Sequence, residues 1–374
     1  MAALPAPDPR PAALLTALAD RCVQCGLCLP HCPTYRLDAS EAESPRGRIA
    51  YIKAVATGLI PASEAGDRHL DHCLGCLRCE SVCPAGVDYG ELLIEARAAQ
   101  RERRSPPLPD RVRLALLAKP GLLAVLVRTQ SLLPNAWRTL PAASANEPFP
   151  ITAGNESAAI FVGCIATAYE SSTRAALAKM LQAVGVACTL PATQTCCGTA
   201  ALHAGETAQA EMLAAHNRAA FAGQARVLTL ASGCHQQMKA SLAGVADVED
   251  ALSFLESRFS RKNFRDAGGR RVALHVPCSQ RSAKNDEALR RLLHSVPGLD
   301  LVELPDTGCC GAAGTHMLSE PERAAALRAP LLVAFERSAA DELLSANIGC
   351  RLHLGQSGNI RVRHPIDFLA EHLA

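Results

Sequence analysis

The chain has 374 residues, of which 49% are hydrophobic, 20% charged and 3% aromatic, and its formal net charge is +2. This length allows two or three domains with their own apolar cores. The near-neutral charge and the few aromatic side chains give no support for a nucleic-acid partner. Seventeen cysteines without a recognisable secretory signal predict a cytoplasmic protein whose thiols bind metals. No apolar run of about 18 residues or more is present, so no membrane-spanning helix is expected.

Eight of the cysteines form two copies of one spacing near the N-terminus. In each copy, three cysteines at intervals of three residues are followed by a fourth cysteine and a proline. This spacing is typical of proteins with two [4Fe–4S] clusters, in which the fourth cysteine of each run ligates the other cluster. The expected ligands are Cys22, Cys25, Cys28 and Cys83 for cluster 1, and Cys73, Cys76, Cys79 and Cys32 for cluster 2. A zinc site usually takes separated cysteine pairs, and a disulfide framework fits a long chain with bunched cysteines less well.

Helices are expected around these two cysteine runs. Ser44 followed by Pro45 has the pattern of a helix N-cap, and apolar residues continue at helical spacing to Gly58. Further helices are expected from Pro61 to about His72 and from Val87 to about Arg104. Together these segments predict an all-α double-cluster ferredoxin domain over residues 12–104.

Residues 105–157 are expected to form a helical connector and a linker. The apolar stretch from Leu114 to Val127 is interrupted by Lys119-Pro120-Gly121, which leaves two segments that are each too short to span a bilayer. We interpret them either as a helical pair packed on the protein's own surface or as a docking site for a partner subunit or the membrane face. Residues 141–157 have the composition of a linker.

The rest of the chain contains an internal duplication. A strand-like segment that ends in cysteine, a Cys-Cys-Gly triplet and a Gly-Cys pair each occur twice in the same order, 114, 113 and 116 residues apart. In each half, short apolar segments alternate with Ala- and Leu-rich helical segments, which predicts a small α/β lobe with a parallel sheet and cysteines at strand ends. The expected lobes cover residues 158–266 and 267–374, so the predicted fold class is α plus α/β.

Each lobe contributes four cysteines to a candidate metal site. Neighbouring cysteines do not readily form a disulfide because it would strain the peptide between them, and the glycine that follows allows close approach of the backbone. The candidate ligands are Cys164, Cys196, Cys197 and Cys234 in the first lobe, and Cys278, Cys309, Cys310 and Cys350 in the second. The alternative is that one lobe keeps its cysteines as a buried remnant of the duplication. The remaining Cys188 is interpreted as a small core residue.

Three other side chains lie close to these cysteines in sequence. Arg46 and Arg48 either lie near cluster 1, where they would raise its reduction potential, or are solvent-facing cations at a helix start. His275, beside Cys278, is expected to be a structural histidine rather than a proton relay.

The motifs together resemble those of the iron–sulfur subunits of bacterial glycolate oxidases over nearly the whole chain. The matching segments are Ser44–Arg48, Val87–Gly90, and the more specific His275–Gln280, Cys309–Thr315 and Ala346–Cys350. The Cys-Cys-Gly lobes also resemble those of heterodisulfide reductase, whose fullest motif ends in a further cysteine. Gln237 and His353 occupy that position here, so a four-cysteine site and a site that includes His353 both remain open.

The resemblance implies an electron-transfer subunit of a larger complex. A separate flavin subunit would oxidise glycolate, or D-lactate, and this chain would pass the electrons to quinone or another acceptor, in peripheral contact with the inner face of the plasma membrane. The sequence has no Gly-x-Gly-x-x-Gly fingerprint for a dinucleotide, and no catalytic residue for substrate oxidation is expected in this chain. The alternatives are the corresponding subunit of a lactate or glycerol-3-phosphate dehydrogenase, and a heterodisulfide reductase-like enzyme, which the missing cysteines disfavour.

Overall fold

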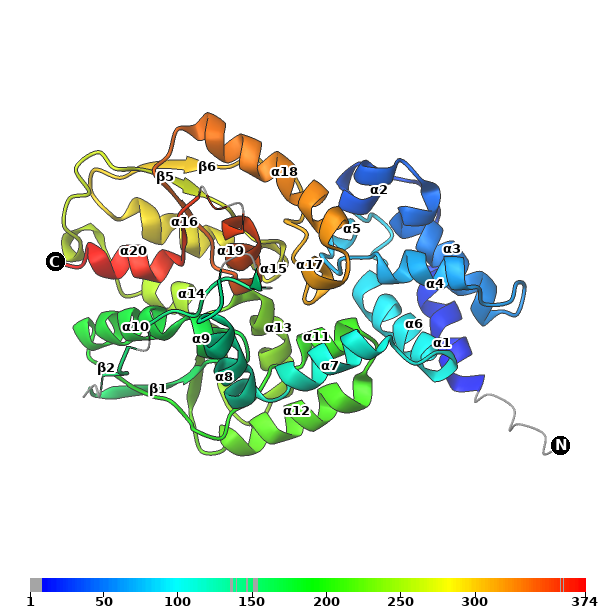
Figure 1. Ribbon diagram of the computed structural model, residues 1–374, viewed down its shortest axis with the longest axis horizontal. Helices are drawn as coiled ribbons and strands as arrows, with labels where there is room; N and C mark the ends of the chain where they lie inside the picture. The colour runs from blue at the N-terminus through cyan, green and yellow to red at the C-terminus, as the bar shows by residue number, and fades with distance from the viewer. Residues whose placement is uncertain are drawn as a thin grey trace. The chain divides into compact units, whose positions relative to one another are not determined.

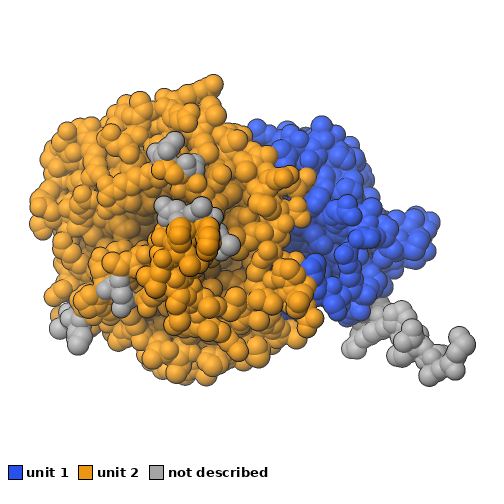
Figure 2. Space-filling view, viewed as in Figure 1, with its two compact units in different colours: residues 1–107, 200–207 blue, residues 108–199, 208–374 orange. Residues whose placement is uncertain are grey.

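The computed structural model describes residues 9–134, 137–138, 140–145, 147–150, 154–356, 358 and 360–374. The Ala/Pro-rich residues 1–8 and part of the expected linker, at 146 and 151–153, lie outside the described residues. The chain divides into two compact units, residues 1–107 with 200–207 and residues 108–199 with 208–374 (Figure 2). Each unit has an apolar core of its own.

The first unit is built from helices, and no strand occurs among its described residues. Ser44, Ser63 and Asp88 each accept a hydrogen bond from a backbone N–H in the first turn of a helix and so begin α3, α4 and α6. This confirms the predicted all-α domain. The helices are α1 (Pro9–Asp20), η1 (Leu29–His31), α2 (Pro33–Asp38), η2 (Glu41–Glu43), α3 (Pro45–Ala56), α4 (Glu64–Asp71), α5 (Arg78–Ser81) and α6 (Tyr89–Arg103) (Figure 1).

The core of the first unit lies between α1, α3 and α6, which bury Leu15, Ile49 and Leu92. A segment from far along the sequence, residues 200–207, also belongs to this unit. Arg97 and Arg101 of α6 donate hydrogen bonds to the carbonyls of His203 and Ala204. The segment from 200 to 207, which we expected within the first lobe, therefore packs with the helices of the first unit.

The second unit contains two four-stranded parallel sheets. Their strand orders are β2-β1-β3-β4 and β6-β5-β7-β8, so the second sheet repeats the order of the first. Ala159 of β1 lies opposite Val227 of β3, and Ala273 of β5 lies opposite Leu343 of β7. This repetition confirms the two duplicated α/β lobes. The strands are β1 (Glu156–Phe161), β2 (Val186–Thr189), β3 (Arg226–Thr229), β4 (Asp247–Asp250), β5 (Arg271–Leu274), β6 (Asp300–Glu303), β7 (Glu342–Leu344) and β8 (Val362–Arg363).

Helices flank both sheets and join the two lobes. Helices α10 and α14 of the first lobe pack on α20 and α16 of the second, and bury Leu177, Leu255, Leu292 and Phe368 in one shared core. The helices are α9 (Ala166–Tyr169), α10 (Ser171–Ala183), α12 (Thr207–Ala220), α13 (Ser232–Ser241), α14 (Ala251–Glu256), η4 (Arg261–Asn263), α15 (Cys278–Ser282), α16 (Asp286–His294), α17 (His316–Ser319), α18 (Pro321–Ser338), α19 (Ile348–Gly355) and α20 (Pro365–Glu371). Helix α11 (Thr199–His203) belongs, except for its first residue, to the segment 200–207 of the first unit.

The connector forms the expected pair of helices, α7 (Leu108–Leu117) and α8 (Pro120–Gln130). One face of α8 packs in the core of the second unit through Leu123 and Val127, whereas Leu122, Val125 and Leu126 on another face are exposed. None of the helices in the described parts of the chain combines the length and the apolar character that crossing a bilayer requires.

Candidate iron–sulfur sites

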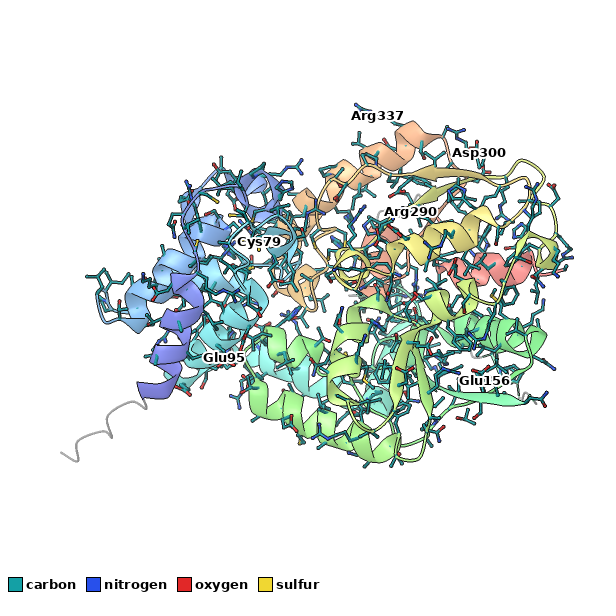
Figure 3. All side chains as sticks on the ribbon, turned by 180° about the vertical axis from the view of Figure 1, so that it is seen from behind. Cys79, Glu95, Glu156, Arg290, Asp300 and Arg337 are labelled. Carbon is teal, nitrogen blue, oxygen red and sulfur yellow. The ribbon has the colours of Figure 1, made fainter. Side chains whose placement is uncertain are left out.

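The cysteines of the two N-terminal runs line two cavities in the first unit, and Cys79 (Figure 3) borders both. The cavities enclose about 440 and 320 Å³, part of which is open to solvent. The first is lined by Cys22, Cys25, Cys28 and Cys83, and the second by Cys32, Cys73 and Cys76. The fourth cysteine of each run therefore lies beside the first three of the other run, which is the arrangement that crossed ligation requires.

The backbone of the two cysteine loops explains why three thiols of each run face one cavity. Gln24 and Gly26 in the first loop have φ of 57° and 81°, and Gly75 and Leu77 at the equivalent positions have φ of 57° and 56°. Non-glycine residues rarely adopt this left-handed conformation. The left-handed conformation at the same two positions indicates that both loops share one backbone shape. This shape directs successive cysteine side chains to the same side.

The electrostatics of the second cavity fit thiolates that bind a cationic iron–sulfur core. Burial raises the pKa of the Cys79 thiol, and the nearby thiols of Cys73, Cys76 and Cys32 raise it further. Burial also acts to raise the pKa of Cys73, but the positive charges of Arg48 and Arg97 outweigh it and hold this pKa below its usual value. Thiolates that repel one another in a buried space are stabilised by bound metal. The donor set is therefore suited to an iron–sulfur cluster.

The two arginines at the start of α3 have different environments. Arg46 lines the first cavity and forms an ion pair of 2.6 Å with the exposed Glu41. Arg48 lines the second cavity, is 1% exposed, and forms an ion pair of 2.6 Å with Glu43. Residues two positions apart on an α-helix, such as Arg46 and Arg48, project in nearly opposite directions. Arg46 thus lies beside the first cavity as expected, whereas Arg48 faces neither that cavity nor solvent.

Arg97 is a residue near the second cavity that sequence reasoning missed. Its guanidinium is buried and donates hydrogen bonds to the carbonyls of Leu70, Asp71 and Cys73, in addition to His203. The ring of His203 in turn lies 3.1 Å from the position that a Cβ on Gly75 would occupy. The only signal in the sequence is an arginine on the apolar face of a predicted helix.

The four cysteines of the first lobe converge where its parallel strands end. Cys164 follows β1, and Cys234 lies in the first turn of α13, after β3. The Sγ atoms of Cys164 and Cys196 are 3.5 Å apart. Cys197 forms hydrogen bonds with the thiols of Cys196 and Cys234, which lower its pKa although burial opposes this.

The second lobe brings its four cysteines together in the same way. The Sγ atoms of Cys310 and Cys350 are 3.0 Å apart, and both side chains are buried. Cys309 is hydrogen-bonded to Cys310, and the charges of Cys278 and Cys309 act on Cys350. In each lobe, the four cysteines predicted as metal ligands therefore lie close together in space.

The glycine of each Cys-Cys-Gly triplet has a defined role. Gly198 and Gly311 have φ of 90° and 89°, and a Cβ on Gly311 would lie 2.8 Å from the carbonyl oxygen of Ala324. The N–H of Gly198 is 3.5 Å from Sγ of Cys196, and the N–H of Gly311 is 3.5 Å from Sγ of Cys309. Hydrogen bonds to ligand sulfur are one means by which proteins tune iron–sulfur clusters.

The other candidate side chains have structural surroundings. The ring nitrogens of His353 lie 3.0 Å from the carbonyl oxygen of Ala324 and 3.4 Å from Oε1 of Gln356, so the ring makes protein contacts at both nitrogens. His275 is buried with Nδ1 3.0 Å from the hydroxyl of Ser345, and burial lowers its pKa to about 4. Cys188 lies in the largest apolar core. These contacts agree with the structural interpretation of His275 and Cys188, and they leave His353 no ring nitrogen without a protein contact.

Comparisons with known proteins agree with this geometry. A family described as "4Fe-4S dicluster domain" matches residues 18–87, and a "Cysteine-rich domain" family matches residues 158–239 and 272–355. The glycolate oxidase iron-sulfur subunit of Escherichia coli K12 is 32% identical over 94% of this chain and 93% of its own length. The chain belongs to the glycolate oxidase iron–sulfur subunit family.

A second glycolate oxidase subunit and a more distant lactate utilization protein also match the chain. The probable glycolate oxidase iron-sulfur subunit of Bacillus subtilis is 31% identical over 94% of this chain and 93% of its own length. Lactate utilization protein A 2 of Bacillus cereus Q1 is 24% identical over 58% of this chain and 98% of its own length. The dicluster domain and the family membership give the chain an iron–sulfur electron-transfer role in an oxidoreductase system.

Proposed function

We propose that the chain is the electron-transfer subunit of a flavin-dependent 2-hydroxy-acid dehydrogenase complex that oxidises glycolate or D-lactate. The observation that carries this proposal is the pair of cavities with crossed cysteine sets in a member of this family. Iron–sulfur clusters supply one-electron redox steps, whereas removal of hydride from a hydroxy acid needs a cofactor such as flavin. In this proposal the flavin belongs to a separate subunit, and this chain does not oxidise the substrate by itself.

The proposed ligands of the two [4Fe–4S] clusters are the crossed sets. Cys22, Cys25, Cys28 and Cys83 would hold cluster 1, and Cys73, Cys76, Cys79 and Cys32 would hold cluster 2. In the first unit, Arg46 would stabilise the added negative charge of a reduced cluster 1, and Arg48 and Arg97 that of a reduced cluster 2.

We also propose a further iron–sulfur cluster in the second lobe. Its four cysteines converge, and Cys309, Cys310 and Cys350 are all buried, which would shield a bound cluster from solvent. The contacts of His353 favour a site of four cysteines over one that includes the histidine. In the first lobe two of the four cysteines, Cys164 and Cys234, are only half-buried, whereas in the second lobe Cys278 alone is, so we favour the second lobe.

The exposed face of α8 is the proposed docking surface of the complex. Leu122, Val125 and Leu126 are 48%, 55% and 43% exposed, and Trp137 is 74% exposed. An apolar row of this kind suits burial against the flavin subunit or contact with a membrane face, where quinone would accept the electrons.

Co-purification tests the proposed function. The tagged chain would be purified without oxygen from its own cells, and the flavin absorbance of any bound protein followed after addition of glycolate, D-lactate or glycerol 3-phosphate. We expect a flavoprotein whose flavin is bleached by glycolate or D-lactate and reoxidised by a quinone. Bleaching by glycerol 3-phosphate alone, or a bound partner without flavin, would contradict the proposal.

A further inference from the structure

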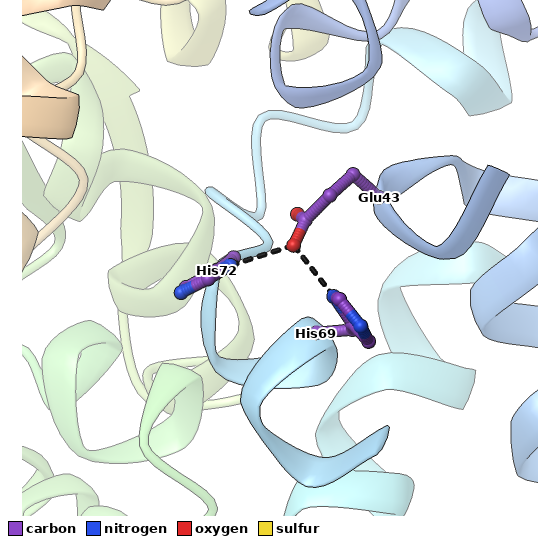
Figure 4. A group of neighbouring side chains, drawn as sticks. All are labelled: Glu43, His69 and His72. Atoms are coloured by element: carbon purple, nitrogen blue, oxygen red, sulfur yellow. Dashed lines mark hydrogen bonds and ion pairs between the residues drawn. The ribbon is translucent and has the colours of Figure 1, made fainter. Parts of the chain in front are cut away.

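Three side chains of the first unit converge at one point that is separate from both cysteine cavities (Figure 4). Oε1 of Glu43 lies 2.6 Å from Nδ1 of His69 and 2.6 Å from Nδ1 of His72. One oxygen and two nitrogens, one atom from each residue, all lie within 4.8 Å of one another. Such a set of lone-pair donors has the composition of a metal site.

The local structure fixes the position of each donor. His69 lies in the last turn of α4 and His72 is the residue that ends this helix, so their spacing of three places both rings on one side. Glu43 is the last residue of η2, directly before the residue that caps α3. Its second oxygen, Oε2, accepts a hydrogen bond of 2.6 Å from the buried Arg48. The guanidinium therefore orients the carboxylate and leaves Oε1 directed at the two rings, as outer-shell partners do in metal sites.

The charge and exposure of the three residues also suit an ion. The carboxyl group of Glu43 forms an ion pair of 2.6 Å with the buried guanidinium of Arg48 and lies against both rings. Glu43 is therefore a carboxylate at neutral pH. Its side chain is 4% exposed, that of His72 is 13% exposed, and that of His69 is 36% exposed. The three side chains thus shield the carboxylate from solvent but leave an opening beside His69, where an ion can enter.

We propose that Glu43, His69 and His72 bind a divalent transition-metal ion, with zinc as the expected ion. Imidazole nitrogens select zinc and similar metals over magnesium and calcium, and two histidines with one carboxylate are a known zinc ligand set. Without the ion, both Nδ1 atoms are hydrogen-bonded to Glu43. On binding, each ring would carry its proton on Nε2 and offer its Nδ1 lone pair, so the ion would take the place of these two hydrogen bonds and water would complete the coordination. The ion would join η2 to the end of α4, one residue before Cys73, and so stabilise the start of the second cysteine run.

Metal analysis of three chains tests this site. The full chain would be purified without oxygen with its clusters, incubated with zinc and freed of loosely bound ions, and its iron and zinc counted. We compare it with His69→Gln, the most exposed of the three ligands, and with His216→Gln, an exposed histidine of α12 as the matched control. We expect about one zinc per chain in the wild type and the control, and loss of this zinc with unchanged iron in His69→Gln. Equal zinc in all three chains would overturn the proposal.

X-ray absorption distinguishes this site from zinc held by cysteines. Nitrogen and oxygen ligands lie at about 2.0–2.1 Å from zinc and sulfur ligands at about 2.3 Å. We expect only the shorter distance for the zinc that His69→Gln loses, and a sulfur shell would overturn the assignment. If His69→Gln does not fold, the melting temperature of the wild type with and without zinc tests the site instead. A rise in melting temperature supports the site and no rise rejects it.

Discussion

The hydroxyl oxygens of Ser232 and Ser279 lie 2.8 Å apart and join the two Cys-Cys-Gly lobes. Ser232 is two residues before Cys234, and Ser279 directly follows Cys278. The side-chain amide of Asn347 donates to both hydroxyls, at 3.4 and 3.1 Å. One polar cluster thus connects the first turns of three helices that carry cysteines of both quartets, which links the geometry of the two candidate sites.

Asn347 is the residue of this cluster whose removal is most informative. Its Oδ1 also accepts hydrogen bonds from the N–H groups of Gly349 and Cys350, so it caps α19. We expect Asn347→Ala to lower the free energy of unfolding by about 1–2 kcal/mol, because it removes this cap and the bonds between the lobes. Iron in the second lobe should also fall.

The control for Asn347→Ala is Ser260→Ala, which removes the capping box of η4 away from the cysteines. Chemical unfolding and iron analysis of both variants check the prediction. An iron content in Asn347→Ala equal to that of the control would show that the polar cluster does not support the metal site.

Crossed ligation predicts which cysteine variants behave alike. Cys83→Ser should change the same cluster signal as Cys25→Ser, because both residues line the first cavity. Cys32→Ser should likewise match Cys76→Ser, with which it shares the second cavity. Electron paramagnetic resonance of the reduced chains measures this, with Cys188→Ala as the control. Uncrossed ligation would instead make Cys83→Ser match Cys76→Ser.

The second lobe can be tested for a third cluster by counting iron. Replacing Cys309 and Cys310 together with alanine should remove about four irons per chain if they ligate a cubane. Replacing Cys196 and Cys197 of the first lobe with alanine removes the same number of thiols. This variant is the comparison. Unchanged iron and undiminished electron transfer after the Cys309 and Cys310 changes would show that these cysteines are structural.

Arg46 and Arg48 should tune different clusters. Arg48→Met should lower the potential of the cluster in the second cavity by on the order of tens of millivolts, because it removes a buried positive charge. Arg46→Met should affect the cluster in the first cavity, and less strongly, because Arg46 is more exposed and solvent screens its charge. Potentiometric titration of both variants measures this. The prediction is wrong if Arg48→Met shifts only the signal that Cys25→Ser removes.

Local signals explain what could be predicted from sequence. The Ser44-Pro45 start of α3, the cysteine spacings and the matched offsets of the two lobes each depend on residues close in sequence or on repetition. The crossed cysteine sets could also be expected, because the fourth cysteine of each run follows a known rule. Helix bounds differed from the expectation by a few residues, as at α4, which begins at Glu64 and not at Pro61.

Contacts between distant residues could not be predicted in this way. Glu43 and His72 are separated by 29 positions, and only the His69-x2-His72 spacing hinted at a shared site. The burial of Arg48 depends on the partner that Glu43 provides, and the packing of residues 200–207 depends on Arg97 and Arg101. Tertiary hydrogen bonds of this kind leave no periodic pattern in the sequence.

In the proposed function, this chain receives electrons from a flavin subunit and does not oxidise the hydroxy acid itself. The most direct test mixes the oxidised chain with glycolate without oxygen, with and without the flavin subunit, and follows iron–sulfur absorbance and paramagnetic resonance. We predict that the clusters are reduced only when the flavin subunit is present. Reduction by glycolate in the chain alone, or clusters that stay oxidised while the flavin of the complex is reduced, would contradict the account.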